Sequence, residues 1–453
     1  MVQLAMNNNR IFPVIIFCFL AALPVRGQGT RGDSLDLATC IQLAWSNNYL
    51  ATSSGLSREQ AHIDHREARQ RLIPSLEARF GHNLSQGRRI DLVTNQYINQ
   101  RFTSGNQSLS TSATLFQGLA ALHKIREQAA AYRASVAEEQ SAREQVMLDV
   151  ILAYTQVLTA RDMLHQMELR LELTRQQVKR TSDLHDNGAI LPADYYDLRG
   201  QYASDKNALN DLHKTYSEAM TNLARAMNVP ADQVGPVRSF GDAFPLTTPD
   251  SLTADGLYDD AVLSLPTVKA TELRILSSKA ALKASRSAHS PRLTFGAGFE
   301  STYSSNSDQT YFNQTKNNMG RYLSFGLNIP IVDHLFVRNN VARSKIQLTD
   351  AELKAANTKN DLQRTISQSL INLRLAAENF KNLVEREENF QESFRIAKVR
   401  FEAGDLNSVL FLTAKNNMDQ ALADKIIGKY EWRLQQFIID YYQGLLPWQQ
   451  FQK

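Results

Sequence analysis

The sequence predicts a mainly α-helical protein with a small β part, built from two copies of one structural unit. Landmarks of the first half recur in the second in the same order, at an offset of about 216 or 217 residues: Ser34-Leu35 with Ser251-Leu252, Pro74 with Pro291, and Asn187-Gly188 with Ala403-Gly404. Each half also holds one very long stretch without proline or glycine and two short stretches of alternating apolar and polar residues. Such a repeat indicates that each half is a complete supersecondary unit lying beside its twin.

The charge balance of the chain argues against a nucleic-acid-binding protein. The 453 residues include 50 Lys and Arg against 46 Asp and Glu, whereas a nucleic-acid binder needs a basic surplus or a basic stripe. After residue 27 there is no run of eighteen consecutive apolar residues, which excludes a transmembrane helix in the mature chain.

Residues 1–27 are predicted to be a signal peptide. Arg10 supplies the positive charge, Ile11 to Leu23 supply a short apolar core, and small residues precede Gln28. Export and cleavage leave Cys40 as the only cysteine of the mature chain, so no internal disulfide forms. We expect Cys40 to be a buried thiol on the apolar face of a helix.

The first unit, residues 28–228, begins with a helix predicted over residues 34–72, which Pro74 ends. The apolar period then changes to two over residues 76–85, and it does so again over 108–115 after a polar segment at 86–105, which predicts two strands. From Leu119 to Asp186 there is no proline or glycine, and Val150, Val157, Leu164, Leu171 and Val178 lie seven apart. This period indicates a coiled-coil-like helix of about 100 Å. Asn187-Gly188 breaks it, and a return helix runs from Pro192 to about Met227.

The second unit, residues 251–446, repeats this plan after a Pro- and Gly-rich linker at 229–250. A helix is predicted over 252–290, strands over 293–299 and 322–331, and a Ser/Asn/Gln-rich loop over 301–320. A second very long helix is expected from Val337 to Ala403, and a last helix runs to about Leu446. Residues 447–453 form a C-terminal tail.

The four predicted strands have the length and alternation of transmembrane β-strands, although a soluble sheet with one buried face would show the same pattern. In a bilayer, four strands cannot close a barrel, since the smallest barrels need about eight, and open edges would leave backbone groups unpaired. A membrane sheet would therefore have to pool strands with other copies of the chain. The long helices would pool in the same way into an α-barrel, closed by oligomerisation.

The chain resembles the TolC-like outer-membrane efflux proteins over essentially all of its mature length. The likeness lies in the duplicated plan, in the two Gly-centred helix breaks and in three local stretches: Ser34-Leu35-Asp36-Leu37-Ala38 through Asn47-Asn48, Pro74-Ser75-Leu76, and Leu115-Phe116-Gln117-Gly118. The resemblance implies a homotrimer with a twelve-stranded barrel in the outer membrane and an α-helical barrel in the periplasm. It also implies that the helical tips dock onto a periplasmic adaptor (a membrane fusion protein) fed by an inner-membrane transporter.

The resemblance also places a gate at the periplasmic tip. Some family members carry acidic residues six and nine positions after the second break glycine, but here those positions are Leu410 and Thr413. The same offsets in the first hairpin give Asp194 and Asp197, which could form a carboxylate ring favouring cations. Alternatively, Asp194 only stabilises the N-terminus of the helix that Pro192 begins. Phe401, Leu410 and Phe411 suggest a partly apolar constriction.

Two further sets of residues are expected to act at surfaces. Gly188 and Gly404 mark the helix reversals where the resemblance places adaptor docking. One face of the strands is expected to contact outer-membrane lipid, through Phe80, Leu109, Phe295, Phe325 and Leu327.

The sequence carries no grouping of nucleophile and base, no phosphate-binding loop and no metal-ligand spacing, so we expect neither an enzyme nor a cofactor. His62 and His65 could pair on one helix face, but without a third ligand a solvated surface is expected. The sequence thus predicts an exit duct for the efflux of small molecules from a Gram-negative cell. The alternatives are an outer-membrane duct for polypeptide secretion of type I and, in a different class, a soluble periplasmic coiled-coil adaptor.

Overall fold

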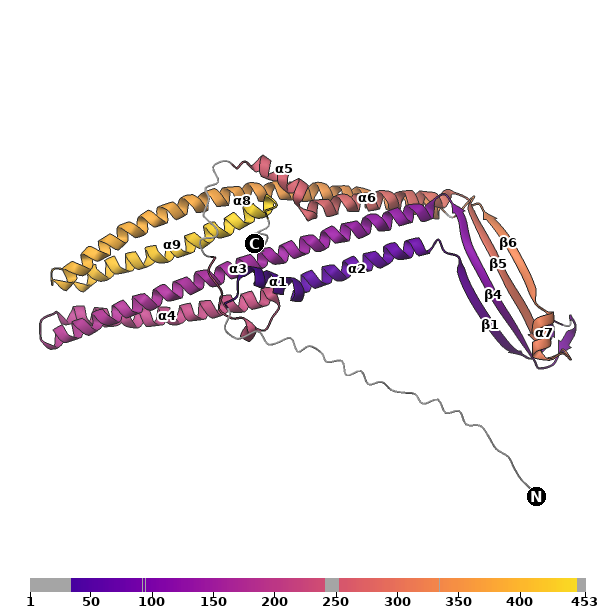
Figure 1. The fold of residues 1–453 in the computed structure, drawn as a ribbon, viewed down its shortest axis with the longest axis horizontal. Helices are drawn as coiled ribbons and strands as arrows, with labels where there is room; N and C mark the ends of the chain where they lie inside the picture. The colour runs from indigo at the N-terminus through magenta and orange to yellow at the C-terminus, as the bar shows by residue number, and fades with distance from the viewer. Residues whose placement is uncertain (1–33, 92, 94, 241–251, 334, 446–453) are drawn as a thin grey trace, which may run out of the picture.

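The computed structural model describes residues 34–91, 93, 95–240, 252–333 and 335–445, and the molecule is long and narrow. Long helices fill most of its length, and a four-stranded sheet stands at one end (Figure 1). The predicted signal peptide, the C-terminal tail and part of the linker lie outside the described residues. The expected fold class, mainly α with a small β part, is confirmed.

The first unit contains four helices, two long strands and a short hairpin. Its elements are α1 (Leu37–Asn47), α2 (Tyr49–Gln70), β1 (Ser75–Ser85), β2 (Arg88–Ile90), β3 (Tyr97–Asn99), β4 (Phe102–Gln117), α3 (Ala120–Asp186) and α4 (Pro192–Met227). A 3₁₀ turn, η1 (Ala231–Gln233), follows α4. Leu35 forms an isolated parallel bridge with Val237, which ties the start of the first unit to the segment after α4.

The second unit repeats this order with a helix in place of the short hairpin. Its elements are α5 (Ala254–Ser264), α6 (Pro266–Arg286), η3 (Ser287–His289), β5 (Arg292–Ser304), α7 (Tyr311–Asn317), β6 (Gly320–Asn328), α8 (Phe336–Glu402) and α9 (Ser408–Tyr442). In Figure 1, α2 and α4 lie along α3, while α6 and α9 lie along α8.

The two very long helices are confirmed, because α3 and α8 each span 67 residues, or about 100 Å. Both begin in the same unusual way. Leu119 and Leu335, which directly precede α3 and α8, have left-handed φ angles of 62° and 63°. Non-glycine residues seldom adopt this conformation, so its occurrence at equivalent positions is a structural sign of the repeat.

The prediction of one helix before each strand pair was wrong, since each unit has two helices there. Asn48 is extended, its side chain accepts a bond of 2.8 Å from the Leu50 N–H, and its Nδ2 donates to the carbonyl of Ala226. In the second unit Pro266 begins α6 and Leu265 is extended. A residue before proline is disfavoured in the helical region, so the break at Leu265 could have been predicted from the sequence.

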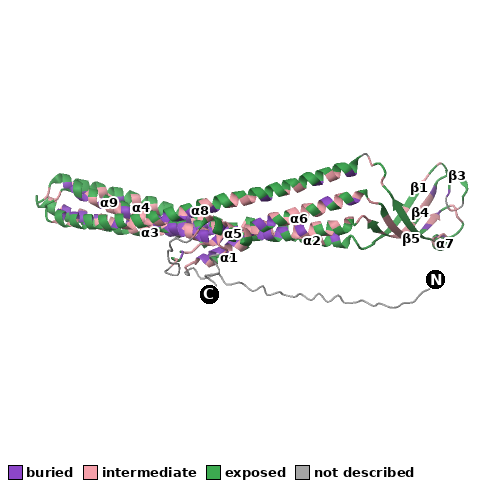
Figure 2. Ribbon diagram, turned by 90° about the horizontal axis from the view of Figure 1, so that it is seen from above, coloured by how far each residue is buried: buried purple, intermediate pink, exposed green. Residues whose placement is uncertain are grey.

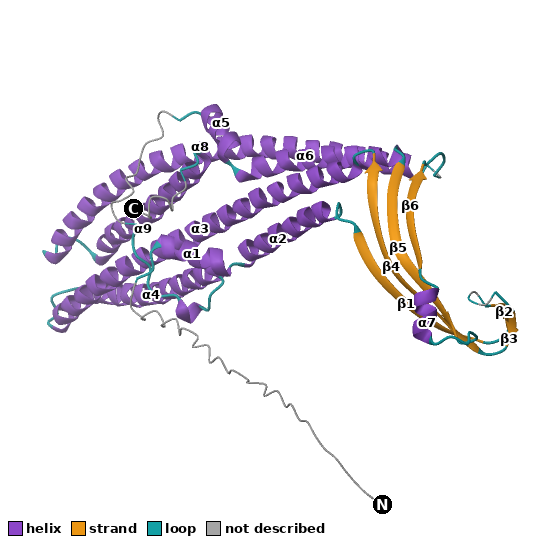
Figure 3. Ribbon diagram, turned by 45° about the vertical axis from the view of Figure 1, so that its right-hand side comes forward, coloured by secondary structure: helices purple, strands orange, loops and turns teal. Residues whose placement is uncertain are grey.

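The four long strands form one antiparallel sheet in the order β1-β4-β5-β6. Figure 3 shows the strands running from the helices to the far end of the molecule. Phe295 lies opposite both Ala113 and Phe325, which fixes the register of the three neighbouring strands. A bulge between Thr114 and Phe116 makes Leu115 an extra residue in β4. Within the described ranges β1 and β6 each pair on one side only, so both edges of the sheet are open.

The polar segments between the strands hold more structure than expected. Residues 86–105 were described only as a polar segment, and they contain the β2–β3 hairpin, while β4 already begins at Phe102. The loop predicted at 301–320 contains the end of β5 and the helix α7. The last strand ends at Asn328, three residues before its predicted end. Tertiary hydrogen bonds hold these segments, and such bonds leave no periodic signal in the sequence.

The main apolar core lies about midway along the helices, where α1 and α5 pack against α3 and α8. Figure 2 shows buried residues gathered there and mostly exposed residues toward both ends.

Cys40 is fully buried in this core, as expected, and burial raises the pKa of its thiol to about 12. Among the described residues, no helix combines the length and apolar character needed to cross a membrane.

Candidate gate and docking surface at the helical tip

The α3–α4 and α8–α9 hairpins reverse at the end of the molecule opposite the sheet (Figure 1). Gly188 and Gly404 have φ angles of +69° and +79°, a region that glycine enters without a Cβ penalty. Helices α3 and α8 terminate in the same way. In each, the N–H of the residue after the glycine donates a hydrogen bond to the carbonyl five residues earlier: Ala189 to Leu184 at 2.8 Å, and Asp405 to Arg400 at 2.9 Å. This is the Schellman pattern of helix termination. Apart from the adjacent residues, no described atom lies within 4 Å of a Cβ built at either glycine, so the space beside each reversal is open in the single chain.

Asp194 and Asp197 of α4 both bind the first residue of α9. Asp194 Oδ1 accepts a bond of 2.8 Å from the Ser408 backbone N–H, and Asp197 Oδ2 accepts one of 2.8 Å from the Ser408 hydroxyl. Asp194 therefore satisfies a free donor at the N-terminus of a helix in the other hairpin, where a negative charge is also favourable. Only 8% of Asp194 is exposed.

The four predicted gate residues do not form one surface of the single chain. Asp194 faces α9 and is buried, whereas Leu410 is 55% exposed. Thr413 is also exposed, and its hydroxyl donates to the carbonyl of Val409 within its own helix. To join a carboxylate ring around a pore, the buried Asp194 would have to leave Ser408, whereas Asp197 is exposed. The gate role of these residues thus remains a prediction about the assembled protein.

An apolar cluster joins the two hairpins next to the tip. Leu198 of α4 packs with Phe394 and Phe401 of α8 and with Phe411 of α9. The rings of Phe401 and Phe411 are stacked with centroids 4.6 Å apart, and Phe411 is fully buried. Phe411 is covered within one chain, so it helps to hold the α3–α4 and α8–α9 hairpins together. Burying a side chain of this size stabilises the folded state by roughly 1.5–3 kcal/mol.

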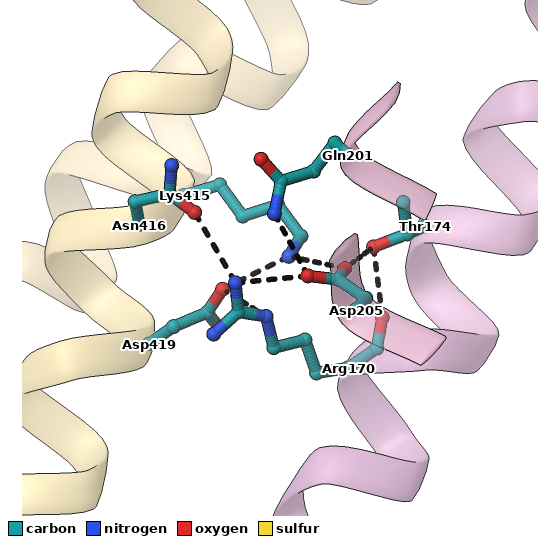
Figure 4. A network of polar contacts seen from close by, with 7 residues as sticks. All are labelled: Arg170, Thr174, Gln201, Asp205, Lys415, Asn416 and Asp419. Carbon is teal, nitrogen blue, oxygen red and sulfur yellow. Dashed lines mark hydrogen bonds and ion pairs between the residues drawn. The ribbon is translucent and has the colours of Figure 1, made fainter. Parts of the chain in front are cut away.

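Farther from the tip, four charged side chains from three helices form a network with a buried centre (Figure 4). Asp205 of α4 and Asp419 of α9 are the acids, while Arg170 of α3 and Lys415 of α9 are the bases. Arg170 reaches one oxygen of each acid at 2.9 Å, and Lys415 lies 3.3 Å from Asp205 and 2.9 Å from Asp419. The side chains of Asp205 and Lys415 are each 1% exposed. Each charge thus touches both opposite charges, and the network crosses from one hairpin to the other.

Neutral groups complete the shell of Asp205. The Thr174 hydroxyl donates to it at 2.6 Å and the Gln201 amide at 2.8 Å. Burial alone would raise the pKa of Asp205, but these hydrogen bonds and the charges of Lys415 and Arg170 outweigh burial and hold the pKa below its ordinary value. Asp205 is therefore ionised at neutral pH, and removal of one cation would leave a buried charge uncompensated.

Sequence reasoning missed this network, since a single acid or lysine on a long helix gives no sign of its partner. The only local signals are the spacings of four residues between Gln201 and Asp205 and between Lys415 and Asp419, which place each pair on one helix face.

The histidine pair of α2 lies against an aromatic ring. His62 and His65 pack their rings near Tyr132, at centroid distances of 5.2 and 6.3 Å.

All five strand residues predicted to face lipid lie on one face of the sheet. Direct partners across strands share a face, and the register pairs Phe295 with Phe325 and Leu293 with Leu327. The same face carries Leu109 and Phe80, and its members are exposed or half-buried in the single chain. The opposite face consists mainly of small and polar residues: Glu77, Arg79, Asn83, Ser108, Ser110, Ser112, Gly296, Gly298, Glu300 and Ser324.

Comparisons with known proteins agree with this architecture. The family model "Outer membrane efflux protein" matches residues 40–229 and 257–437. Outer membrane protein TolC of Salmonella enteritidis is 21% identical over 448 residues, covering 97% of this chain and 87% of that protein.

Solved structures share the fold at lower identity. The CmeC outer membrane channel of Campylobacter jejuni superposes with a TM-score of 0.78 at 16% identity, covering 90% of this chain and 86% of that one. The outer membrane protein VceC of Vibrio cholerae gives 0.76 at 12% identity, covering 90% and 96%. A membrane protein of Pseudomonas aeruginosa gives 0.75 at 19% identity, covering 90% and 92%. With most of its length matched by the family model, the chain belongs to the outer membrane efflux protein family.

Proposed function

We propose that three copies of this chain assemble into an exit duct that carries small molecules out of the cell across the outer membrane. The observation that supports this most is the sheet. It has one apolar, exposed face, one polar face and two open edges, and it stands at the end of helices about 100 Å long. In the assembled duct the apolar face would contact lipid, the polar face would line an aqueous lumen, and the two edges would pair with neighbouring copies.

The open edges support self-association within the membrane. Unpaired N–H and C=O groups cost several kcal/mol each in hydrocarbon, so β1 of one copy is expected to pair with β6 of the next. Two copies would supply only eight strands, about the smallest closed barrel, whereas twelve leave a wider lumen. Family membership supports three copies. The helices of residues 28–228 and 251–446 would then close the periplasmic part of the duct.

The open helix reversals support docking onto a periplasmic adaptor that connects the duct with an inner-membrane transporter. A Gly404→Val variant tests this, because valine resists the positive φ angle while meeting no neighbour. Gly404→Asn is the matched control, since asparagine tolerates this conformation. We expect the valine variant to assemble normally but to export poorly, and the asparagine variant to export well. Wild-type export by the valine variant would contradict docking at this reversal.

Fractionation and conductance test the duct itself. We expect the full-length protein to sediment with the outer membrane and to form ion-conducting pores when added to planar lipid bilayers. Recovery in the freely soluble periplasmic fraction would instead support a soluble adaptor.

A further inference from the structure

The short helix α7 lies on the apolar face of the sheet, at the end away from the long helices (Figure 3). The register fixes the side: Gln107, Ser301 and Tyr303 share the face of Phe295 and Phe325. The Ser301 hydroxyl donates to the carbonyl of Thr315 in α7 at 2.8 Å, and the Gln107 amide donates to the Tyr311 hydroxyl. If the proposed function holds, α7 sits on the side of the sheet that contacts lipid.

Buried hydrogen bonds hold α7 against the end of β5. Gln314 is 1% exposed; its carbonyl oxygen accepts from the Ser304 N–H at 2.9 Å and its amide donates to the Ser304 carbonyl at 3.0 Å. The ring of Tyr303 stacks on His82 at 6.1 Å and contacts Tyr311 at 5.0 Å. The first contact passes over Gly105, which lies between the two rings on β4 and has no side chain to separate them.

This arrangement leaves a large apolar side chain without cover. Phe312 is 82% exposed although its helix is fixed in place, and the neighbouring Tyr311 is 42% exposed. Removing such a ring from water is favourable, so a fixed and exposed phenylalanine indicates a surface that contacts something other than water. Aromatic residues gather where a barrel meets the membrane surface, because their rings suit the boundary between hydrocarbon and headgroups.

Two basic side chains accompany the aromatic ones. The guanidinium of Arg321 lies 5.7 Å from the ring centroid of Phe299, with both side chains on the apolar face. Lys316 is exposed on α7. Among the described residues neither cation lies in an ion pair with a carboxylate, so their charges are available to anions.

The height of these residues on the sheet matches the membrane surface. From Leu293 to Phe299 the strand rises about 20 Å at 3.4 Å per residue, close to the roughly 25 Å apolar band of a membrane barrel. Arg321 lies in the row of Phe299, at the upper limit of that band, and the residues that hold α7 lie one and two rows beyond it.

We propose that α7, with Tyr311, Phe312 and Lys316, and the nearby Arg321 form an anchor in the headgroup region of the outer leaflet, where the two cations bind the phosphates of lipid A. This surface rests on the proposed function and goes beyond it. It joins the apolar strand face directly, and its charge is complementary to a phosphorylated glycolipid.

Depth measurements on spin-labelled variants test the anchor. Cys40 is fully buried and is the only cysteine among the described residues. Single cysteines can therefore be labelled at Phe312, Phe325 and Tyr322 in the mature protein, from which the predicted signal peptide with Cys18 has been removed, in lipid bilayers. For the label at Phe325→Cys we expect more collisions with oxygen, which concentrates in hydrocarbon, than with a water-soluble nickel complex. Tyr322 lies on the opposite face, so for the label at Tyr322→Cys we expect more collisions with the nickel complex than with oxygen. For Phe312→Cys we expect the intermediate ratio of the headgroup region.

The outcomes separate the two proposals. If the label at 325 is in hydrocarbon but the label at 312 is as open to nickel as that at 322, the anchor is wrong while the duct survives. If the label at 312 is closed to both agents, a second copy covers α7, which also overturns the anchor. A label at 325 that is not in hydrocarbon would contradict the proposed function as well.

Lipid binding tests the two cations. We expect the double variant Lys316→Gln, Arg321→Gln to weaken binding of diphosphoryl lipid A by about twenty-five-fold, since each basic side chain at an anionic membrane surface is worth roughly fivefold in affinity. Arg79→Gln, on the opposite face, should bind like the wild type. Equal affinity of the wild type for dephosphorylated lipid A would overturn the phosphate assignment.

Discussion

Asp194 Oδ1 accepts a 2.8 Å hydrogen bond from the backbone N–H of Ser408, so a side chain of one hairpin caps the first turn of a helix in the other. The bond is buried and lies close to the tip, where the hairpins would have to move apart if the duct opens there. It gives Asp194 a structural task within the single chain.

Asp194→Ala is expected to loosen the tip. Loss of a capping carboxylate costs about 0.5–2 kcal/mol, and Ser408 N–H would lose its partner. We expect the mean conductance of single pores in planar bilayers to rise. Asp186→Ala is the control, because Asp186 ends α3 with its side chain 74% exposed. Unchanged conductance with altered cation selectivity would instead support a carboxylate ring at the gate.

Lys415→Met is expected to destabilise the helical part by about 3–5 kcal/mol, the usual cost of removing one partner from a buried ion pair. The variant leaves Asp205 and Asp419 with Arg170 alone. The measurement is the urea midpoint of helix unfolding in detergent. Arg395→Met provides the comparison, since the Arg395–Glu392 pair is mostly exposed and exposed ion pairs contribute little to stability. Equal losses for the two variants would refute a strongly coupled network.

The stability of the chain should depend on pH through Asp440 of α9. Burial raises the pKa of this carboxyl to about 6, and Arg433 offsets only part of that effect. Between the ordinary value of 3.8 and pH 6, the folded state keeps a proton that the unfolded state has lost, so stability falls as pH rises through this range.

Asp440→Asn should therefore be more stable than the wild type at pH 7.5 and should match it near pH 4. The check is a pair of urea titrations at the two pH values. If the variant and the wild type differ in stability by the same amount at pH 7.5 and near pH 4, the pKa of the Asp440 carboxyl is not raised in the folded state.

Leu109→Arg is expected to impair insertion, whereas Ser110→Arg should be tolerated. The two residues are neighbours in β4 but lie on opposite faces of the sheet. A charged side chain facing lipid costs about 2–4 kcal/mol near the midplane of the bilayer, while Ser110 lies opposite Glu77 and would place the new charge beside an acid. The measurement is the amount of each variant recovered in the outer-membrane fraction, compared with the wild type. Equal yields would mean that the faces are assigned wrongly.

Much of this fold could be predicted from the sequence, because its main elements are long and regular. Stretches free of proline and glycine gave α3 and α8 nearly to the residue, and strict alternation placed Phe295 and Phe325 on one face. The breaks at Asn48 and Leu265 were missed. At Asn48 the break depends on a contact with the carbonyl of Ala226, which is remote in the sequence.

The candidate site was less predictable, since it depends on pairs of residues more than 200 positions apart. Asp194 meets Ser408 and Asp205 meets Lys415 only because two separate hairpins lie side by side. The helix α7 was missed for a similar reason. Its seven residues lie in a polar segment, and buried bonds from Gln314 hold it rather than any periodic apolar face.

The mass of the full-length protein in mild detergent tests the central claim most directly. The open edges of β1 and β6 require partners from other copies, and we expect light scattering, corrected for bound detergent, to give the mass of three chains. Cysteines introduced into facing positions of β1 and β6 should then cross-link between chains. A monodisperse monomer that keeps its strands in detergent would contradict the account.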